Sequence, residues 1–148
     1  FVQTTDYVMI DVEQMHDARI IPIFASAIEA RANRRPEVLQ QYMGDSVGWY
    51  EGDALVVETI NVNPQQMQQS STAITKNGRI TERFTRYSDT EIVYRFTVED
   101  SDLYSQAWTA ELSFHTSDGH LYEYACHEGN YSMPGTLAGA RRLEAEQK

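Results

Sequence analysis

The densest group of reactive side chains lies near the end of the chain, where residues 122–131 read YEYACHEGNY. This stretch holds the single cysteine, Cys126, followed directly by His127 and Glu128. Successive residues of a strand point to opposite faces, so Cys126 and His127 cannot form a nucleophile–base pair if one strand runs through both. A lone cysteine is more often a small buried residue than a nucleophile. We therefore predict a core strand in which Cys126 plays no chemical part, with His127 and Glu128 as site residues at its exit.

His16, in the sequence MHDAR, is the candidate partner of His127. Two imidazoles can act as general acid and general base near neutral pH. Imidazoles and nearby carboxylates can also bind a metal, but the sequence contains no HExxH, HxH or paired CxxC spacing. A purely structural histidine is the third interpretation, and the three stay open. We predict neither a metal nor a cofactor.

Strand alternation carries several ionisable side chains toward the expected core. In residues 79–86, RITERFTR, Glu82 shares a face with Ile80 and Phe84. The same argument, applied strand by strand, turns inward the side chains of Arg19, Glu58, Glu82 and Tyr94. A buried carboxylate is costly unless it is paired or protonated. These residues therefore form either a structural arginine–glutamate network or the polar lining of a ligand cavity.

The leading functional hypothesis is a cofactor-independent enzyme that moves a proton on a small apolar or aromatic molecule, as a lyase, isomerase or hydrolase. His127 and His16 would be the acid–base pair, oriented by Glu82 or Glu58. Arg19 or Arg83 would stabilise a developing negative charge. The remaining candidate substrate-binding residues are Trp49, Tyr94, Trp108, Glu128 and Asn130. The alternatives are a non-catalytic binding protein for such a molecule and a structural or assembly subunit, which includes a homo-oligomer.

These side chains must be positioned by a protein that the sequence predicts to be all-β. Two N-terminal strands, the second interrupted by Pro22, precede a helical segment over residues 25–42 in which Pro36 would begin a second short helix. Gly52-Asp53 predicts a tight hairpin, and residues 61–78 form a polar connection. The later strands are RITERFTR, EIVYRFTV, AWTAELSFH and HLYEYAC. We expect an antiparallel meander that forms a small barrel or strongly curved sheet, with a short helical insertion and a C-terminal helix or tail.

Length and charge narrow the possible classes of protein. The 148 residues suit a single domain (1–148), and the net charge of −10 argues against nucleic-acid binding. No apolar run approaches the roughly 18 residues that a membrane span needs. One cysteine allows no internal disulfide. Because the sequence opens on Phe1 in a strand-like pattern, we expect a removed leader or the C-terminal part of a longer precursor.

Six motifs, taken together and in order, resemble those of a largely uncharacterised family of exported bacterial β-proteins. They are HDARIIPI, MGDSVGWYEGDALVVET, ITERFTR, YRFTVEDSD, AWTAELSF and YEYACHEGNY. The resemblance covers nearly the whole chain. It implies a barrel-like domain and a periplasmic location, but no settled reaction. Its polar motif positions are Glu13, His16, Arg19, Asp45, Trp49, Glu51, Glu58, Glu82, Arg83, Arg86, Trp108, Glu111, Glu123, His127, Glu128 and Asn130. The chain departs from the pattern at Tyr50 and in EDSDLYSQAW, where the family tends to place prolines.

Overall fold

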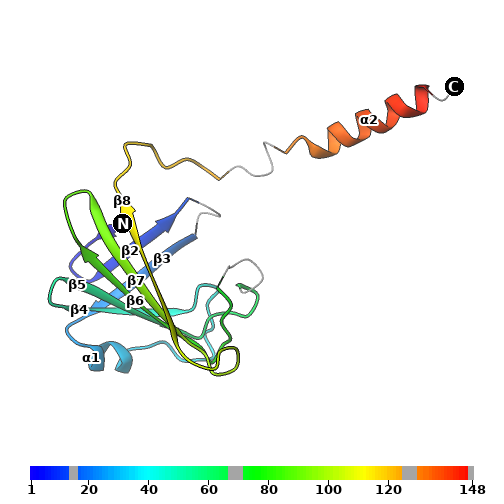
Figure 1. The fold of residues 1–148 in the computed structure, drawn as a ribbon. Coiled ribbons are helices and arrows are strands. Elements are labelled where there is room, and N and C mark those ends of the chain that lie inside the picture. The colour runs from blue at the N-terminus through cyan, green and yellow to red at the C-terminus, as the bar shows by residue number, and fades with distance from the viewer. Residues whose placement is uncertain (14–16, 67–71, 125–129, 147–148) are drawn as a thin grey trace. The chain divides into compact units, whose positions relative to one another are not determined.

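The computed structural model describes residues 1–13, 17–66, 72–124 and 130–146 (Figure 1). His16, Cys126, His127 and Glu128 lie outside these ranges. The described residues form the strands β1 (Val2–Gln3), β2 (Tyr7–Val12), β3 (Asp17–Phe24), β4 (Asp45–Glu51), β5 (Ala54–Ile60), β6 (Arg79–Arg86), β7 (Glu91–Glu99) and β8 (Trp108–His115), and the helices α1 (Ala27–Ala32) and α2 (Ser132–Glu146). The predicted all-β class, with a short helical insertion and a C-terminal helix, is confirmed.

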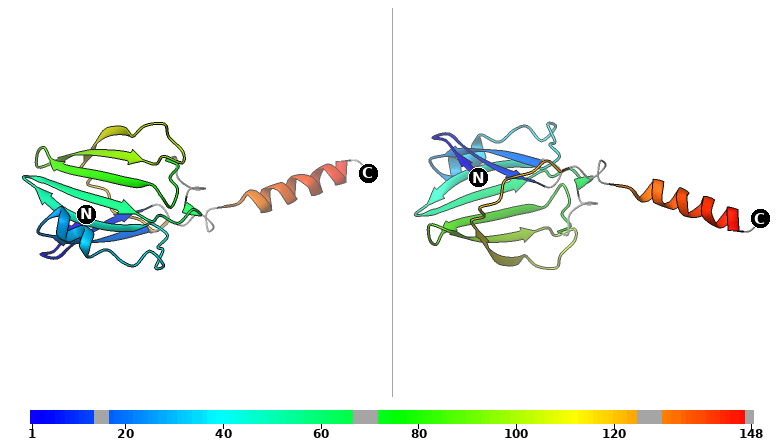
Figure 2. Two further views of the ribbon diagram at one scale, coloured as in Figure 1. Left: turned by 90° about the horizontal axis from the view of Figure 1, so that it is seen from below. Right: turned by 90° about the horizontal axis from the view of Figure 1, so that it is seen from above.

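The chain divides into two compact units. The first unit comprises Phe1–Asp11 and Ala18–Gly119 and holds nearly the whole sheet, whose strand order follows the chain from β1 to β8. The sheet curls into a half-barrel, with the blue N-terminal strands and the green-to-yellow strands on opposite sides (Figure 2). This agrees with the predicted strongly curved sheet.

The sheet departs from a pure antiparallel meander at one pair of strands. β3 and β4 run parallel, with Ile23 opposite Gly48 and Phe24 opposite Trp49. A parallel pair needs a crossover connection, and the segment containing α1 supplies it. The pairing begins directly after Pro22, whose backbone cannot donate a hydrogen bond.

Local sequence explains how α1 and the first tight hairpin form. Ser26 caps α1 by accepting a hydrogen bond from the backbone N–H of Glu29. Pro36 does not begin a helix as expected; a single turn closes there, with the N–H of Leu39 donating to its carbonyl oxygen. The predicted Gly52-Asp53 hairpin is confirmed, and its glycine adopts a φ of +59°.

The sheet buries apolar side chains on both of its faces. On the inner face of the curl, Val8 and Ile21 pack with Leu55, Val57 and Phe84. On the outer face, α1 covers β4 and β5 through contacts among Ala30, Val47, Trp49 and Val56. A helix on one face and a curled sheet on the other therefore give two cores where the sequence led us to expect one.

The second unit comprises Val12–Asp17 and His120–Lys148. The structure assigns no strand to residues 120–124, so the prediction of a strand over HLYEYAC is wrong for its described part. Leu121, Tyr122 and Tyr124 are exposed there. The described residues of α2 are exposed along its whole length. Neither helix in the described ranges is long and apolar enough to cross a membrane.

Candidate functional site

A cleft of about 480 Å³ opens where the β4–β5 and β6–β7 hairpins meet the end of β8. We call it the hairpin cleft. Its apolar lining consists of Phe1, Val8, Leu55, Phe84, Ile92 and Phe114. The polar side chains around it include Tyr50, Asp53, Arg86, Asp89, Glu91 and His115. An apolar interior with a few polar groups at its edge, at this volume, is the usual construction of a small-molecule site.

The rings of Phe1, Phe84 and Phe114 line one wall of the hairpin cleft and are packed together with Tyr94, which does not itself line the cleft. The Phe84 ring stacks on the Tyr94 ring, with centroids 4.8 Å apart. Phe1 meets Phe84 edge-on at 5.5 Å, and Phe114 lies 5.1 Å from Tyr94. Rings that pack on one another lose little conformational freedom when a ligand binds, so this wall is preorganised for an apolar or aromatic group.

Glu82 comes two residues before Phe84 in β6, so both side chains lie on the inner face, and Glu82 is only 3% exposed. Arg19 donates two hydrogen bonds to its carboxylate, at 2.7 and 2.9 Å, and the Tyr94 hydroxyl donates a third at 2.8 Å. Burial and the neighbouring Glu82 carboxylate raise the pKa of the Tyr94 phenol far above its usual value. Glu82 does not line the cleft. The sequence left two interpretations open, a structural arginine–glutamate network and the polar lining of a ligand cavity. The contacts of Glu82 agree with the structural network.

Glu58 lies on the outer face, away from Glu82. Val57 is the residue that pairs with Glu82, so its neighbour Glu58 projects to the other side of the sheet. The two glutamates therefore cannot act together on one substrate.

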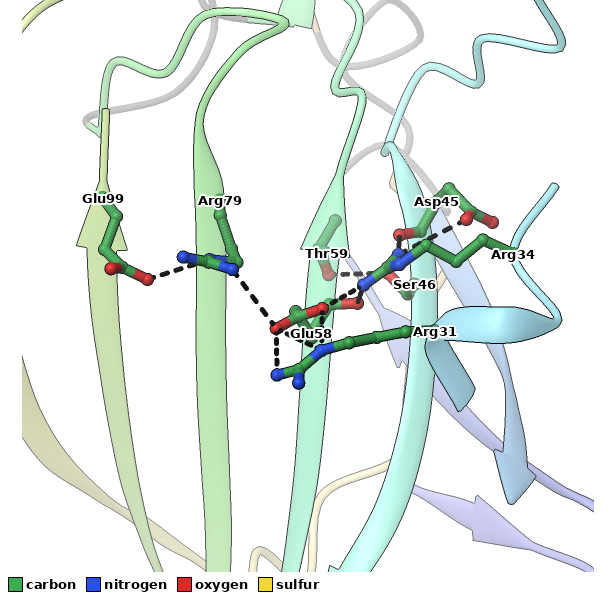
Figure 3. Close-up of polar contacts among 8 residues, drawn as sticks. All are labelled: Arg31, Arg34, Asp45, Ser46, Glu58, Thr59, Arg79 and Glu99. Carbon is green, nitrogen blue, oxygen red and sulfur yellow. Dashed lines mark hydrogen bonds and ion pairs between the residues drawn. The ribbon is translucent and has the colours of Figure 1, made fainter. Parts of the chain in front are cut away.

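The Glu58 carboxylate is surrounded by arginines (Figure 3). Arg34 donates to it at 2.6 Å, Arg31 at 2.8 Å, and Arg79 lies 3.9 Å away. Burial alone would raise the pKa of Glu58, but the hydrogen bonds from Arg31 and Arg34 outweigh it and hold the pKa below its usual value.

Asp45 and Glu99 extend this cluster along the outer face. Arg34 also donates to the backbone and side-chain oxygens of Asp45, at 2.8 and 3.4 Å, while Arg79 pairs with Glu99 at 2.9 Å. Three guanidinium groups thus meet three carboxylates, all shown in Figure 3, and the cluster is electrically balanced. It ties the segment after α1 to β4 and β5.

Two further predicted substrate contacts, Trp49 and Arg83, also belong to the outer face. Trp49 is 4% exposed, and the Arg31 guanidinium lies over its ring at 5.6 Å. The Trp49 indole N–H and Arg83 both donate to Glu51, at 2.9 and 2.6 Å. These two hydrogen bonds lower the pKa of Glu51, with Arg83 the larger cause. The structure therefore does not bring Arg83 together with Glu82.

Trp108 lies on the inner face at the far end of β8 from Phe114, and does not line the hairpin cleft. Its indole nitrogen is buried without a hydrogen-bond partner among the described residues. Asn130 is exposed, and its side-chain oxygen accepts hydrogen bonds from the backbone and hydroxyl of Ser132 at the start of α2. The backbone contact is an Asx-turn, which directs the chain into α2.

The proposed acid–base pair, His127 and His16, and the neighbouring Glu128 lie outside the described residues, so their roles stay predictions. Within the described ranges, no group of three or more histidine, cysteine, aspartate or glutamate side chains is arranged to hold a metal ion.

Sequence reasoning missed most residues of the hairpin cleft. His115 was not named as a site residue; it is an exposed side chain at the end of β8 that lines the cleft. Asp53 was recognised only as a turn residue, and Arg86 as a strand residue and a polar motif position, without a predicted role in binding. The available signal was their position at the ends of strands, where loops of a curled sheet converge.

Comparison of the chain with protein-family models, curated proteins and solved structures gave no match. The resemblance to a family of exported bacterial proteins accordingly stays a prediction.

Proposed function

We propose that the protein binds a small apolar or aromatic molecule in the hairpin cleft without changing it chemically. The observation that carries this proposal is the wall of packed rings around Phe84, which lines a space of about 480 Å³. Such a volume lies within the range of roughly 300–1,000 Å³ that small-molecule sites occupy. From the resemblance to exported bacterial proteins, we further propose that the protein is located in the periplasm.

Binding is favoured over catalysis by the state of Glu82. Both of its carboxylate oxygens already accept hydrogen bonds from Arg19, and one also accepts from Tyr94. A general base must be within reach of the proton that it removes, and Glu82 lies outside the cleft lining. An acid–base reaction that uses His127 and His16 remains the earlier prediction.

The test is calorimetric titration of the purified chain with naphthylmethanol, a neutral aromatic probe. We expect saturable binding to a single site. Replacing Phe114 with alanine removes a ring that lines the cleft, and should weaken binding by about ten-fold, the usual effect of losing a buried aromatic contact. Leu112 is the matched control, because it is a half-exposed apolar residue on the same face of β8 but outside the cleft lining.

Leu112→Ala should leave the dissociation constant within two-fold of the wild-type value, on the order expected for a residue that makes no contact. Equal weakening by the Leu112→Ala and Phe114→Ala variants would place binding elsewhere on the sheet. No saturable binding of naphthylmethanol by the wild-type chain would contradict the proposal outright. Native mass spectrometry of the protein purified from its source would then show whether a small molecule or a defined oligomer is present.

A further inference from the structure

We infer that the ligand of the hairpin cleft carries a positive charge, and that Asp53 is the side chain that recognises it. This inference rests on the proposed binding function and adds the chemical class of the ligand: an apolar or aromatic body joined to a protonated amine.

Acidic side chains outnumber basic ones around the hairpin cleft. Its lining includes three carboxylates, from Asp53, Asp89 and Glu91, and a single guanidinium, from Arg86. Three negative charges and one positive charge leave a net charge of −2 for these side chains. The whole chain carries a further excess of acid, with a formal net charge of −10. The potential at the cleft therefore attracts cations and repels anions.

Most of these charged groups already have partners. Arg86 pairs with Asp89 at 3.0 Å and also donates to the backbone oxygen of Ser88. Glu91 accepts a hydrogen bond from the Ser113 hydroxyl at 2.7 Å. The Arg86–Asp89 pair cancels in charge, so neither member is available to hold a charged ligand group without breaking that contact.

Asp53 is the exception. Its side chain has no hydrogen bond or ion pair with any described residue, and it lines the cleft from the exposed turn between β4 and β5. The two-residue turn, with Gly52 at a φ of +59°, fixes the backbone from which the carboxylate projects. A carboxylate held at the edge of an apolar cleft without a cation of its own is suited to an ammonium group.

Aromatic side chains near the same edge of the cleft would help to bind the ammonium group of the ligand. Tyr50 lines the cleft, and its hydroxyl accepts a hydrogen bond from the Gln3 side chain at 2.9 Å, which holds the ring in place. Phe1 and Phe114 line the cleft as well, with ring centroids 6.1 Å apart. The faces of aromatic rings attract cations, so a ligand ammonium can be stabilised by a ring while its body packs on Phe84.

The experiment compares three naphthalene probes of nearly equal size near neutral pH: protonated naphthylmethylamine, neutral naphthylmethanol and anionic naphthoate. We expect the amine to bind wild-type protein about two- to five-fold more tightly than the alcohol, as a solvent-exposed charge pair allows. Naphthoate should bind more weakly than either. Raising the salt concentration should reduce the difference between amine and alcohol, because exposed charges are screened.

Asp53→Asn is the critical variant, since asparagine keeps the turn preference of aspartate while removing its charge. It should reduce the preference for the amine over the alcohol, since Glu91 alone then remains as a carboxylate without a cation, and should leave the affinity for the alcohol unaffected. Glu37→Gln is the matched control. It removes one exposed carboxylate at the opposite end of the same strands, beside Ile60 and Arg79, and should preserve the preference for the amine.

The two proposals fail in different ways. If wild-type protein binds the alcohol and the amine equally, or if Asp53→Asn and Glu37→Gln have equal effects, the inference of a cationic ligand is overturned while the binding function stands. If none of the three probes binds, both proposals are overturned.

Discussion

Arg19 and Glu82 are 63 residues apart in the sequence, yet the Arg19 guanidinium donates two parallel hydrogen bonds to the Glu82 carboxylate. The side chains are 17% and 4% exposed, respectively. The pair joins β3 to β6 across the inside of the half-barrel, and Tyr94 on β7 completes it. A carboxylate at this position would be costly if it were alone, so the pair permits a polar group inside an apolar face.

Removing one member of this pair should destabilise the protein strongly. We expect Arg19→Met to lower the free energy of unfolding by about 3 kcal/mol, because it leaves the buried Glu82 carboxylate without its cation. Urea denaturation measured at neutral pH checks this. Arg86→Met is the control, since it breaks the exposed ion pair with Asp89 and should cost less than about 1 kcal/mol. Similar losses in the two variants would contradict the structural role of Arg19.

Tyr94 should contribute less than Arg19, and through its hydroxyl alone. Tyr94→Phe keeps the ring that stacks on Phe84 but removes the hydrogen bond to Glu82. We expect a loss of about 1 kcal/mol in the free energy of unfolding, the usual net value of one such bond. Naphthylmethanol affinity should be unchanged, because the ring wall is preserved. A drop in affinity without a loss of stability would instead assign the hydroxyl to the ligand site.

Alternation along single strands was sufficient to predict much of this arrangement. The period of two placed Glu82 with Ile80 and Phe84, and Tyr94 between Ile92 and Phe96, as the structure has them. The Gly52-Asp53 turn was equally readable, because few sequences other than Gly-containing pairs suit a two-residue hairpin. These features depend on neighbours in the sequence, which is why they could be found without a structure.

The relation between strands could not be predicted in the same way. Glu58 and Glu82 both lie beside apolar residues, so both were expected to share one interior. The register that sets Val57 opposite Glu82 places them on opposite faces, and α1 gives the second face a core of its own. Residues 120–124 show the same limit, since an alternating pattern predicts a strand only where a partner strand pairs with it. The cleft depends on such long-range pairing as well.

The stability of the protein should depend on pH through Glu58. Its pKa in the folded protein is lower than the ordinary value of 4.5, so the folded state favours the ionised form. The resulting stabilisation is present above the unfolded-state pKa and is lost as the pH falls from about 4.5 through the folded-state value. We therefore expect the free energy of unfolding of wild-type protein to fall more steeply below pH 4.5 than that of Glu58→Gln.

Denaturant titrations at a series of pH values from neutral to acid measure both slopes. At neutral pH, Glu58→Gln should itself lose about 2–4 kcal/mol, because the largely buried Arg34 loses its 2.6 Å carboxylate partner and keeps only the longer ion pair with Asp45, at 3.4 Å. Glu37→Gln serves as the control, since its exposed carboxylate has no ion pair among the described residues, and it should keep the wild-type slope. Parallel slopes for wild type and Glu58→Gln would contradict the inferred pKa.

Gly44 and Gly52 allow backbone strain and steric clash to be separated. Both have positive φ angles, +79° and +59° respectively. A Cβ atom at Gly44 would lie 2.8 Å from the backbone oxygen of Ile60, whereas one at Gly52 would meet nothing within 4 Å. Gly52→Ala should therefore cost about 1 kcal/mol, from the left-handed conformation alone.

Gly44→Ala carries the same strain and adds a clash with backbone that cannot move aside, so we expect a loss of about 3 kcal/mol or more. Thermal and urea denaturation of the two variants, measured side by side, give the comparison. Equal losses would mean that the segment before β4 can shift away from Ile60. In that case the close approach of Gly44 to the end of β5 would not be a constraint on the fold.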